Sequence, residues 1–169
     1  MEQSMTVGVI GAGTMGQGIA QIAASAGHDV LLVDRDEAAM ERALANLDRI
    51  LKRLVEKGRL APGESDDILS RIRTSSELTA CAPCGLVIEA IVEKEDVKQT
   101  VFASLESIVG ETTILATNTS SLSVTRLAAG LAYPSRFLGL HFFNPAPLLP
   151  LVEVVCLLYT SDAADERNS

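Results

Sequence analysis

Residues 5–34, MTVGVIGAGTMGQGIAQIAASAGHDVLLVD, decide the fold of this 169-residue chain. The apolar run from Val7 to Ile10 predicts a buried parallel strand that stops at a G-x-G-x-x-G pattern. The following residues, rich in Ile and Ala, predict a buried helix that ends at Gly27. The run Val30–Val33 then predicts a second buried strand. The pattern itself comprises Gly11, Ala12, Gly13, Thr14, Met15 and Gly16.

The glycine pattern is suited to hold a diphosphate at the start of the helix. Gly11 permits a tight turn, Gly13 lets the backbone approach a pyrophosphate, and Gly16 lets the helix lie close to the sheet. Unpaired backbone N–H groups and the helix dipole favour an anion there by about 0.3–1 kcal/mol. Because strand, glycine turn and helix occur in the required order, we predict dinucleotide binding; a purely structural glycine turn is the alternative.

Asp34 indicates which dinucleotide is bound. It ends the second strand, at roughly the 20-residue distance from the glycine pattern where an acid holds the adenosine ribose. A carboxylate there accepts hydrogen bonds from both ribose hydroxyls and repels a 2′-phosphate, so we predict NAD as the cofactor. Arg35 follows directly and keeps NADP open as the alternative, because its cation can pair with a 2′-phosphate.

The composition is typical of one globular domain. Hydrophobic residues make up 47% of the chain and charged residues 21%, which excludes a disordered protein. The formal net charge is −8, so we predict no nucleic-acid partner. No apolar run approaches the roughly 18 residues of a membrane span, and the start of the chain has no targeting pattern. We therefore expect a cytoplasmic protein without a membrane partner.

The three cysteines do not predict a disulfide framework, because their number is odd. Cys81 and Cys84 form a C-x-x-C motif, but no second pair accompanies them. A redox or metal role is the less favoured interpretation, and we predict no metal site.

The rest of the chain predicts alternating helices and strands around an inserted helical hairpin. Residues 36–57 predict a long amphipathic helix with Asp36 as its N-cap, and a second helix from residue 62 or 63 to 71 completes a hairpin over residues 40–73. Such a hairpin is too long for an ordinary crossover. Further strands are expected at 85–90, 113–117, 137–142 and 151–155, with helices at 94–108 and 122–131. This pattern predicts an α/β fold with a doubly wound, mainly parallel sheet of the Rossmann type.

One face of the long helix is basic. This basic strip is either a solvated surface or a site for an anionic ligand, and spacing alone leaves both open. It comprises Arg42, Arg49, Lys52, Arg53 and Lys57.

Polar residues follow the later strands, where an open α/β sheet binds its ligands. Histidine titrates near neutrality, so His141 is the natural proton acceptor of a reaction at pH 7. The turn at residues 144–147 brings Glu153 back towards the imidazole, and Ser120 can donate to a substrate oxygen. A buried structural histidine and a strand-end acid are the alternative at this point. The residues at this edge are Glu93, Asn118, Thr119, Ser120, His141, Asn144 and Glu153.

Four motifs resemble the 3-hydroxyacyl-CoA dehydrogenase family. They are G-L-H-F-F-N-P-A-P at 139–147, L-V-E-V at 151–154, A-T-N-T-S-S-L at 116–122 and V-I-E-A-I-V-E at 87–93. The resemblance extends from Met5 to about Val155, and the first motif is too long for a chance match. It implies NAD-dependent oxidation of an L-3-hydroxyacyl-CoA to the 3-ketoacyl-CoA, as in fatty-acid β-oxidation or related short-chain acyl-CoA metabolism.

The resemblance also implies roles for single residues. His141 matches the catalytic base, Glu153 the acid that orients it, and Ser120 the hydroxyl that contacts the reacting oxygen of the substrate. Lys57 matches a basic contact to coenzyme A, which favours the ligand-binding interpretation of the basic strip. Besides the glycine pattern, we predict cofactor contacts by Asp34, Glu93, Lys98, Asn118 and Asn144.

The chain departs from the family near its end. Leu149-Pro150 stand where members often carry Met-Lys. The family continues into an all-helical second domain that walls the acyl pocket and forms a homodimer, and we expect that domain to be absent here. We expect residues 1–155 to be the NAD-binding domain. Residues 156–166 resemble the translation of a transposon-end sequencing adapter, and we expect residues 156–169 to be a non-native tail.

These departures lead to an expectation about the activity of the chain. The chain is expected to bind NAD but to be catalytically impaired, since its pocket is open to water. The alternatives are a non-catalytic dinucleotide-binding module and a different NAD-dependent hydroxyacid dehydrogenase. A hydroxyacid dehydrogenase of another family would not be expected to carry the H-F-F-N-P motif.

Overall fold

The computed structural model describes residues 4–156, so the predicted tail lies outside the described residues except for Cys156. The strands are β1 (Thr6–Ile10), β2 (Asp29–Val33), β3 (Ile72–Ser75), β4 (Leu86–Glu89), β5 (Ile114–Thr117), β6 (Phe137–Phe142) and β7 (Val152–Val155). The helices are α1 (Thr14–Ser25), α2 (Glu37–Glu56), α3 (Glu64–Ser70), α4 (Glu95–Glu106) and α5 (Val124–Ala128). Short 3₁₀ turns are η1 (Leu78–Cys81), η2 (Pro134–Arg136) and η3 (Ala146–Leu148).

The strands form one sheet in the order β3-β2-β1-β4-β5-β6-β7. Neighbouring strands run parallel except for β6 and β7, which pair antiparallel. The winding direction reverses between β1 and β4, and open sheets of this kind bind ligands at the carboxyl ends beside that reversal. The predicted doubly wound, mainly parallel sheet is confirmed.

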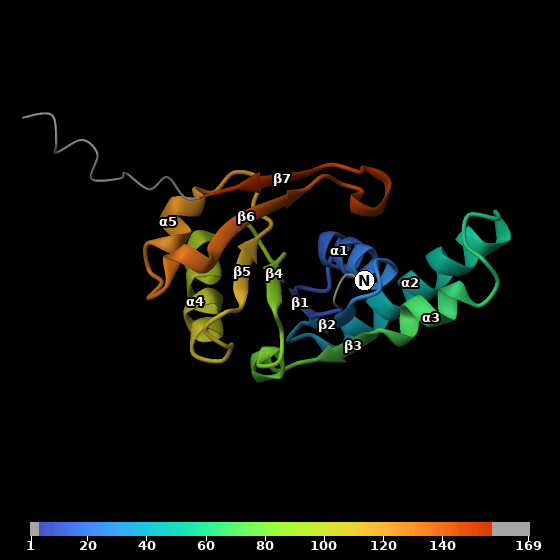
Figure 1. Ribbon diagram of the computed structural model, residues 1–169, viewed down its shortest axis with the longest axis horizontal. Coiled ribbons are helices and arrows are strands. Elements are labelled where there is room, and N and C mark those ends of the chain that lie inside the picture. Colours follow the sequence, from blue (N-terminus) through green and yellow to red (C-terminus); the bar gives the residue numbers. More distant parts are fainter. Residues whose placement is uncertain (1–3, 157–169) are drawn as a thin grey trace, which may run out of the picture.

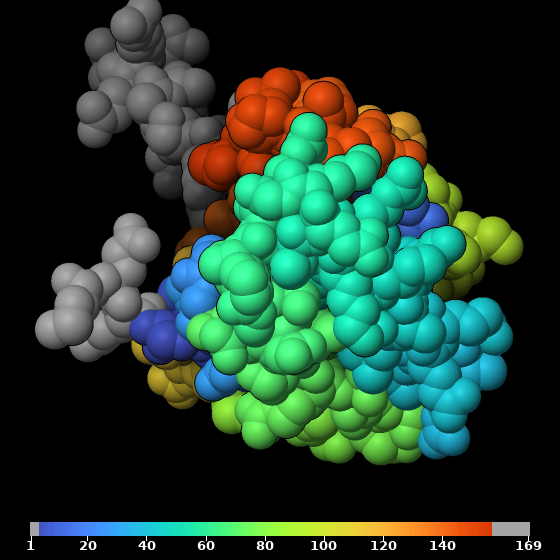
Figure 2. Space-filling model, turned by 90° about the vertical axis from the view of Figure 1, so that its right-hand side faces the viewer, coloured from blue at the N-terminus to red at the C-terminus, as the bar shows by residue number. Residues whose placement is uncertain are grey.

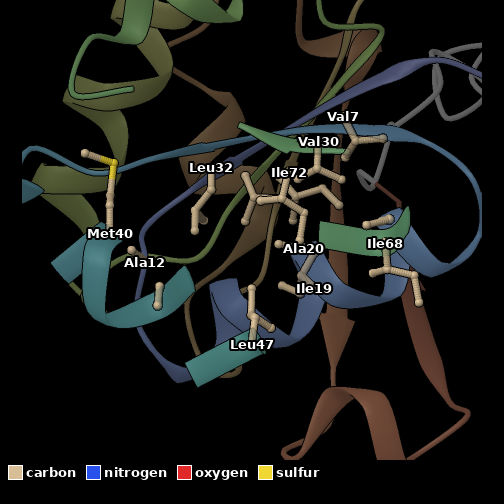
Figure 3. Packing of buried hydrophobic residues seen from close by; sticks show 14 of the residues in the cluster. Val7, Ala12, Ile19, Ala20, Val30, Leu32, Met40, Leu47, Ile68 and Ile72 are labelled. Atoms are coloured by element: carbon tan, nitrogen blue, oxygen red, sulfur yellow. The ribbon is translucent and has the colours of Figure 1, made fainter. Parts of the chain in front are cut away.

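Helices cover both faces of the sheet (Figure 1). The face under α1, α2 and α3 contains the cluster of Figure 3, in which Ile19, Leu32 and Leu47 are almost fully buried. The opposite face packs under α4 and α5 and includes Phe102 and Leu127. Burial of each large apolar side chain contributes about 1.5–3 kcal/mol. Across residues 4–156, none of the helices combines the length and the apolar composition that crossing a membrane requires.

Helices α2 and α3 form the predicted helical pair and occupy much of the surface seen in Figure 2. This pair is the predicted helical hairpin, but residues 72–75 after it form β3, a strand that the sequence did not predict and that pairs parallel with β2. The pair is therefore the crossover between β2 and β3. Only Ile72 of this edge strand is buried, so the sequence shows no apolar alternation that indicates a strand.

Candidate active site

The glycine pattern forms the turn between β1 and α1. Gly11 has a φ of 107°, which favours glycine. A Cβ added to Gly16 would lie 1.8 Å from the carbonyl oxygen of Gly11, so no side chain fits where α1 crosses the turn. A Cβ added to Gly13, in contrast, would meet no other part of the protein within 4 Å. The turn thus leaves space for a diphosphate beside Gly13, at the N-terminus of α1.

Asp34 lies at the carboxyl end of β2 and binds the glycine turn. Its Oδ2 accepts a hydrogen bond from the backbone N–H of Ala12 (2.8 Å), and its Oδ1 accepts one from the N–H of Asp36 (3.0 Å). Each carboxylate oxygen retains acceptor capacity for a ribose hydroxyl. Asp34, Gly13 and Met15 line a cavity of about 590 Å³ that continues to Val97 of α4. This cavity has the size of a small-molecule site.

The glycine turn is also held from its other side, by residues that the sequence analysis did not select. Gln17 Nε2 donates to the carbonyl oxygen of Ala12 (2.9 Å), and Asn46 Nδ2 donates to Gln17 Oε1 (2.8 Å). The peptide groups on both sides of Ala12 are therefore fixed by hydrogen bonds to Asp34, after β2, and from Gln17 of α1, and Asn46 of α2 holds the Gln17 side chain.

His141 and Glu153 face each other across β6 and β7. The register pairs the two residues directly, so both side chains project from the same side of the strand pair. Nδ1 of His141 lies 2.8 Å from Oε2 of Glu153. A carboxylate accepts hydrogen bonds, so in the neutral imidazole this contact is compatible with the tautomer that carries its proton on Nδ1 and has Nε2 free to accept. The predicted contact between the two side chains is thus present in the fold.

This pair borders a second cavity, of about 340 Å³. The wall opposite consists mainly of the serine-rich segment after β5, including Ser120 and Ser121. The His141 side chain is 23% exposed and that of Glu153 is 55% exposed. An imidazole, a carboxylate and a hydroxyl therefore meet at an open pocket, which is the arrangement that proton transfer to or from a small substrate needs.

Glu93 binds the segment that carries Ser120. Its Oε1 accepts hydrogen bonds from the Thr119 hydroxyl and from the backbone N–H groups of Ser120 (3.1 Å) and Ser121 (3.2 Å). Partial burial raises the pKa of Glu93, but the hydrogen bonds from Thr119 and Lys98 and the Lys98 charge outweigh burial and lower the pKa to about 2. Glu93 is therefore ionised at neutral pH and holds this segment as an acceptor.

Lys98 is buried, although we predicted a cofactor contact for it. Its Nζ lies 2.6 Å from Oε1 of Glu89 and 3.2 Å from Oε2 of Glu93, and its side chain has no exposed surface. The ammonium group thus faces two carboxylates, and the predicted contact to the cofactor stays a prediction. Glu89 was not among the predicted site residues; the signal was an acid that ends an otherwise apolar strand, Leu86–Glu89.

Of the remaining predicted site residues, Asn118 lies beside His141, whereas Asn144 and Lys57 are exposed. Asn118 Oδ1 accepts a hydrogen bond from the N–H of Phe142 (2.9 Å), which joins the end of β5 to the end of β6 beside His141. Asn144 lies exposed in the connection between β6 and β7, and Lys57 lies exposed at the C-terminus of α2. Neither residue lines either cavity.

Two of the five residues of the basic strip form ion pairs with nearby acids. Arg42 forms an ion pair with Asp36 (3.3 Å) and Lys52 with Asp48 (2.9 Å). These ion pairs favour the interpretation that this part of the basic strip is a solvated helix surface. Exposed ion pairs of this kind contribute little to stability.

The C-x-x-C motif is buried. Cys81 and Cys84 are 0% and 3% exposed, and hydrogen bonding between them raises the pKa of Cys81 and lowers that of Cys84. Between residues 4 and 156, no group of three or more His, Cys, Asp or Glu side chains is arranged to hold a metal ion.

The strand order, the glycine turn at the start of α1 and the acid at the end of β2 define a dinucleotide-binding domain of the Rossmann type.

The family comparison identifies the domain. The family described as 3-hydroxyacyl-CoA dehydrogenase, NAD binding domain, matches residues 6–168. This chain belongs to that family. The resemblance seen in the sequence is thereby confirmed, as is NAD as the cofactor.

Individual relatives agree with this assignment. A 3-hydroxybutyryl-CoA dehydrogenase of Clostridioides difficile is 45% identical over 157 residues, which are 93% of this chain and 56% of the relative. A 3-hydroxyadipyl-CoA dehydrogenase of Escherichia coli is 46% identical over 96% of this chain and 34% of the relative. The crystal structure of 3-hydroxybutyryl-CoA dehydrogenase from Escherichia coli K12 superposes with a TM-score of 0.91 at 44% identity, over 97% of this chain and 35% of that chain. This chain therefore spans about half, or less, of the length of these relatives.

Proposed function

We propose that this chain binds NAD(H) across the carboxyl edge of the sheet, with the adenosine at Asp34 and the nicotinamide near His141. The connection between β4 and α4 supports this placement because it lines one cavity and binds the segment that lines the other. Ile91 and Val92 line the cavity at the glycine turn, whereas Glu93 binds the segment that lines the cavity at His141. A single extended ligand can therefore contact both cavities along this connection.

We propose further that the protein oxidises L-3-hydroxyacyl-CoA thioesters to 3-ketoacyl-CoA. Nε2 of His141 removes the proton of the 3-hydroxyl group, and Glu153 stabilises the imidazolium that forms. Ser120 donates a hydrogen bond to the reacting oxygen. Bound NAD⁺ supplies the acceptor for the hydride that leaves C3. The observation that carries this proposal is the 2.8 Å contact between His141 and Glu153, opposite Ser120 and on the same sheet edge as the glycine turn.

The 169-residue chain is expected to bind NAD and to turn over slowly. Glu153 is more than half exposed, and every described residue of β7 is exposed. Water therefore reaches the pair and weakens the electrostatic stabilisation that a closed site provides. The coenzyme A contact by Lys57 and a homodimer of the full-length form remain predictions that rest on the family.

The test compares NADH oxidation by acetoacetyl-CoA with NADH oxidation by free acetoacetate. We expect slow turnover with the thioester, none with the free acid, and loss of the thioester reaction in His141→Gln. An equal rate with free acetoacetate would indicate a different hydroxyacid dehydrogenase. A rate that His141→Gln leaves unchanged would exclude this histidine as the base.

A second candidate function is a non-catalytic dinucleotide-binding module. The observation that favours it is the contrast between the hydrogen-bonded glycine turn and the exposed edge strand that carries Glu153. This module would bind NADH with the same affinity in the wild type and in His141→Gln, and it would show no reaction with acetoacetyl-CoA.

A further inference from the structure

A buried ionic network lies under the site, between β4 and α4. The side chains of Glu89 and Lys98 have no exposed surface. Glu89 Oε1 accepts from Lys98 Nζ (2.6 Å) and from the N–H of Ile91 (2.7 Å), and its Oε2 accepts from the Thr117 hydroxyl (2.7 Å). Lys98 then reaches Oε2 of Glu93 at 3.2 Å. Every carboxylate oxygen of Glu89 thus has a partner, and the network ends at the one acid that extends to the surface.

Stability alone does not account for this network. The cost of removing two charges from water often exceeds their attraction, so a buried ion pair can commonly be replaced by neutral groups of similar shape without loss of stability. Instead, the network fixes the position of the Glu93 carboxylate. The Glu93 side chain is 36% exposed, and Lys98 is the cation that holds one of its oxygens while the other binds the segment after β5.

We propose that Glu89 is a positioning residue for the reaction: through Lys98 it fixes the Glu93 carboxylate, and through Glu93 it fixes the segment that presents Ser120 to His141. This inference rests on the proposed function. Glu89 itself touches neither cavity, and it is absent from the residues that line them.

Replacing Glu89 with a neutral residue changes the contacts of Lys98 and the position of the Glu93 carboxylate. The buried ammonium of Lys98 loses its nearer partner and depends on Glu93 alone, which draws the Glu93 carboxylate towards α4. The N–H groups of Ser120 and Ser121 then lose their common acceptor, and the pocket at His141 loosens. The glycine turn and Asp34 make no hydrogen bond to this network. The link to their cavity is the N–H of Ile91, and the amide oxygen of a glutamine at position 89 can still accept from it, so we expect the adenosine end to keep its geometry.

The test compares two ligands that share the adenosine end. NADH contacts both cavities in the proposed placement, whereas ADP-ribose lacks the nicotinamide. For Glu89→Gln we expect NADH affinity, measured by fluorescence titration, to fall roughly five- to tenfold, the effect of about one lost hydrogen bond. ADP-ribose affinity, measured by competition, stays within about twofold of the wild type. The matched control is Asp48→Asn, which neutralises an acid in an exposed pair with Lys52 and leaves both affinities unchanged.

The outcomes separate this inference from the proposed function. Equal weakening of both ligands by Glu89→Gln indicates a general structural role and overturns the inference, as does unchanged NADH affinity. The double variant Glu89→Gln/Lys98→Met removes both buried charges and keeps the test valid if the single variant does not fold. It must show the same selective loss of NADH affinity. A folded wild type that binds neither ligand contradicts the proposed function itself.

Discussion

The two ends of the site are built in different ways. The adenosine end comes from the contiguous residues 5–34, and β1 and β2 are buried at every position except the first of each strand. The end at His141 comes from β5, β6 and β7, and β7 is exposed at all four residues. One end therefore lies in the middle of the sheet, and the other depends on an edge strand with a single described neighbour.

This difference separates cofactor binding from catalysis. Hydrogen bonds from Asp34 and Gln17 and the buried strands hold the glycine turn, so its geometry does not depend on β6 or β7. The contact between His141 and Glu153 depends on strand pairing at an edge, where local opening costs least free energy. Binding of NADH should therefore tolerate changes that impair the histidine and carboxylate pair.

The largest expected effect concerns Gly16, at the adenosine end. Gly16→Ala places a Cβ against the carbonyl of Gly11, so we expect a loss of about 3 kcal/mol in the free energy of unfolding and no NADH binding. Gly13→Ala is the matched control, because its Cβ meets no other part of the protein. This variant should unfold like the wild type in urea and bind NADH roughly tenfold more weakly. Equal stability of the two variants would show that the turn is not packed as described.

Asp34 should determine the affinity of the adenosine end. Asp34→Ala removes the acceptor for ribose hydroxyls and for the N–H of Ala12. Hydrogen bonds to a charged group contribute about 1.5–3 kcal/mol, so NADH affinity should fall roughly ten- to a hundredfold. The preference for NADH over NADPH should narrow, because no carboxylate repels the 2′-phosphate. A variant that keeps both the affinity and the preference would place the ribose elsewhere.

Glu93 joins the two ends, and its ionisation gives a pH dependence. Its pKa in the folded protein is lowered from the ordinary 4.5 to about 2, so the charged form is favoured by folding. This stabilisation is fully present above pH 4.5 and is lost as the pH falls from 4.5 to about 2. Glu93→Gln should therefore be less stable than the wild type at neutral pH, with a difference that shrinks across this window in urea unfolding. A difference independent of pH would contradict this assignment.

The smallest expected effect concerns the exposed edge. Val154 on β7 is 61% exposed, and Val154→Ala should change the free energy of unfolding by less than about 0.5 kcal/mol. Val9 on β1 is fully buried, and Val9→Ala should cost roughly 2 kcal/mol. Calorimetric melting of both variants measures the difference between their losses in the free energy of unfolding. Equal losses would mean that β7 is covered in solution.

The adenosine end was predictable from the sequence because its interactions are local. The spacing of Gly11, Gly13 and Gly16 defines the turn, and Asp34 follows within the next strand. The contact between His141 and Glu153 was predictable as well, since a turn at residues 144–147 returns the chain antiparallel to β6. The roles of these residues in catalysis remain predictions.

The buried network and β3 were not predictable in the same way. A lysine in an amphipathic helix is normally exposed, and Lys98 is buried only because Glu89, on a separate element, provides a carboxylate beneath it. β3 has one buried residue, so its strand character comes from pairing with β2 and not from its own pattern. Both features depend on contacts between separate elements. The hydrophobic periodicity of a single segment does not encode such contacts.

Titration of the 169-residue chain with NADH tests the central claim most directly, namely that the cavity at the glycine turn and Asp34 binds the cofactor without help from His141. The account predicts saturable enhancement of NADH fluorescence that ADP-ribose reverses by competition, in the wild type and in His141→Gln alike. A folded chain that leaves NADH fluorescence unchanged would contradict it.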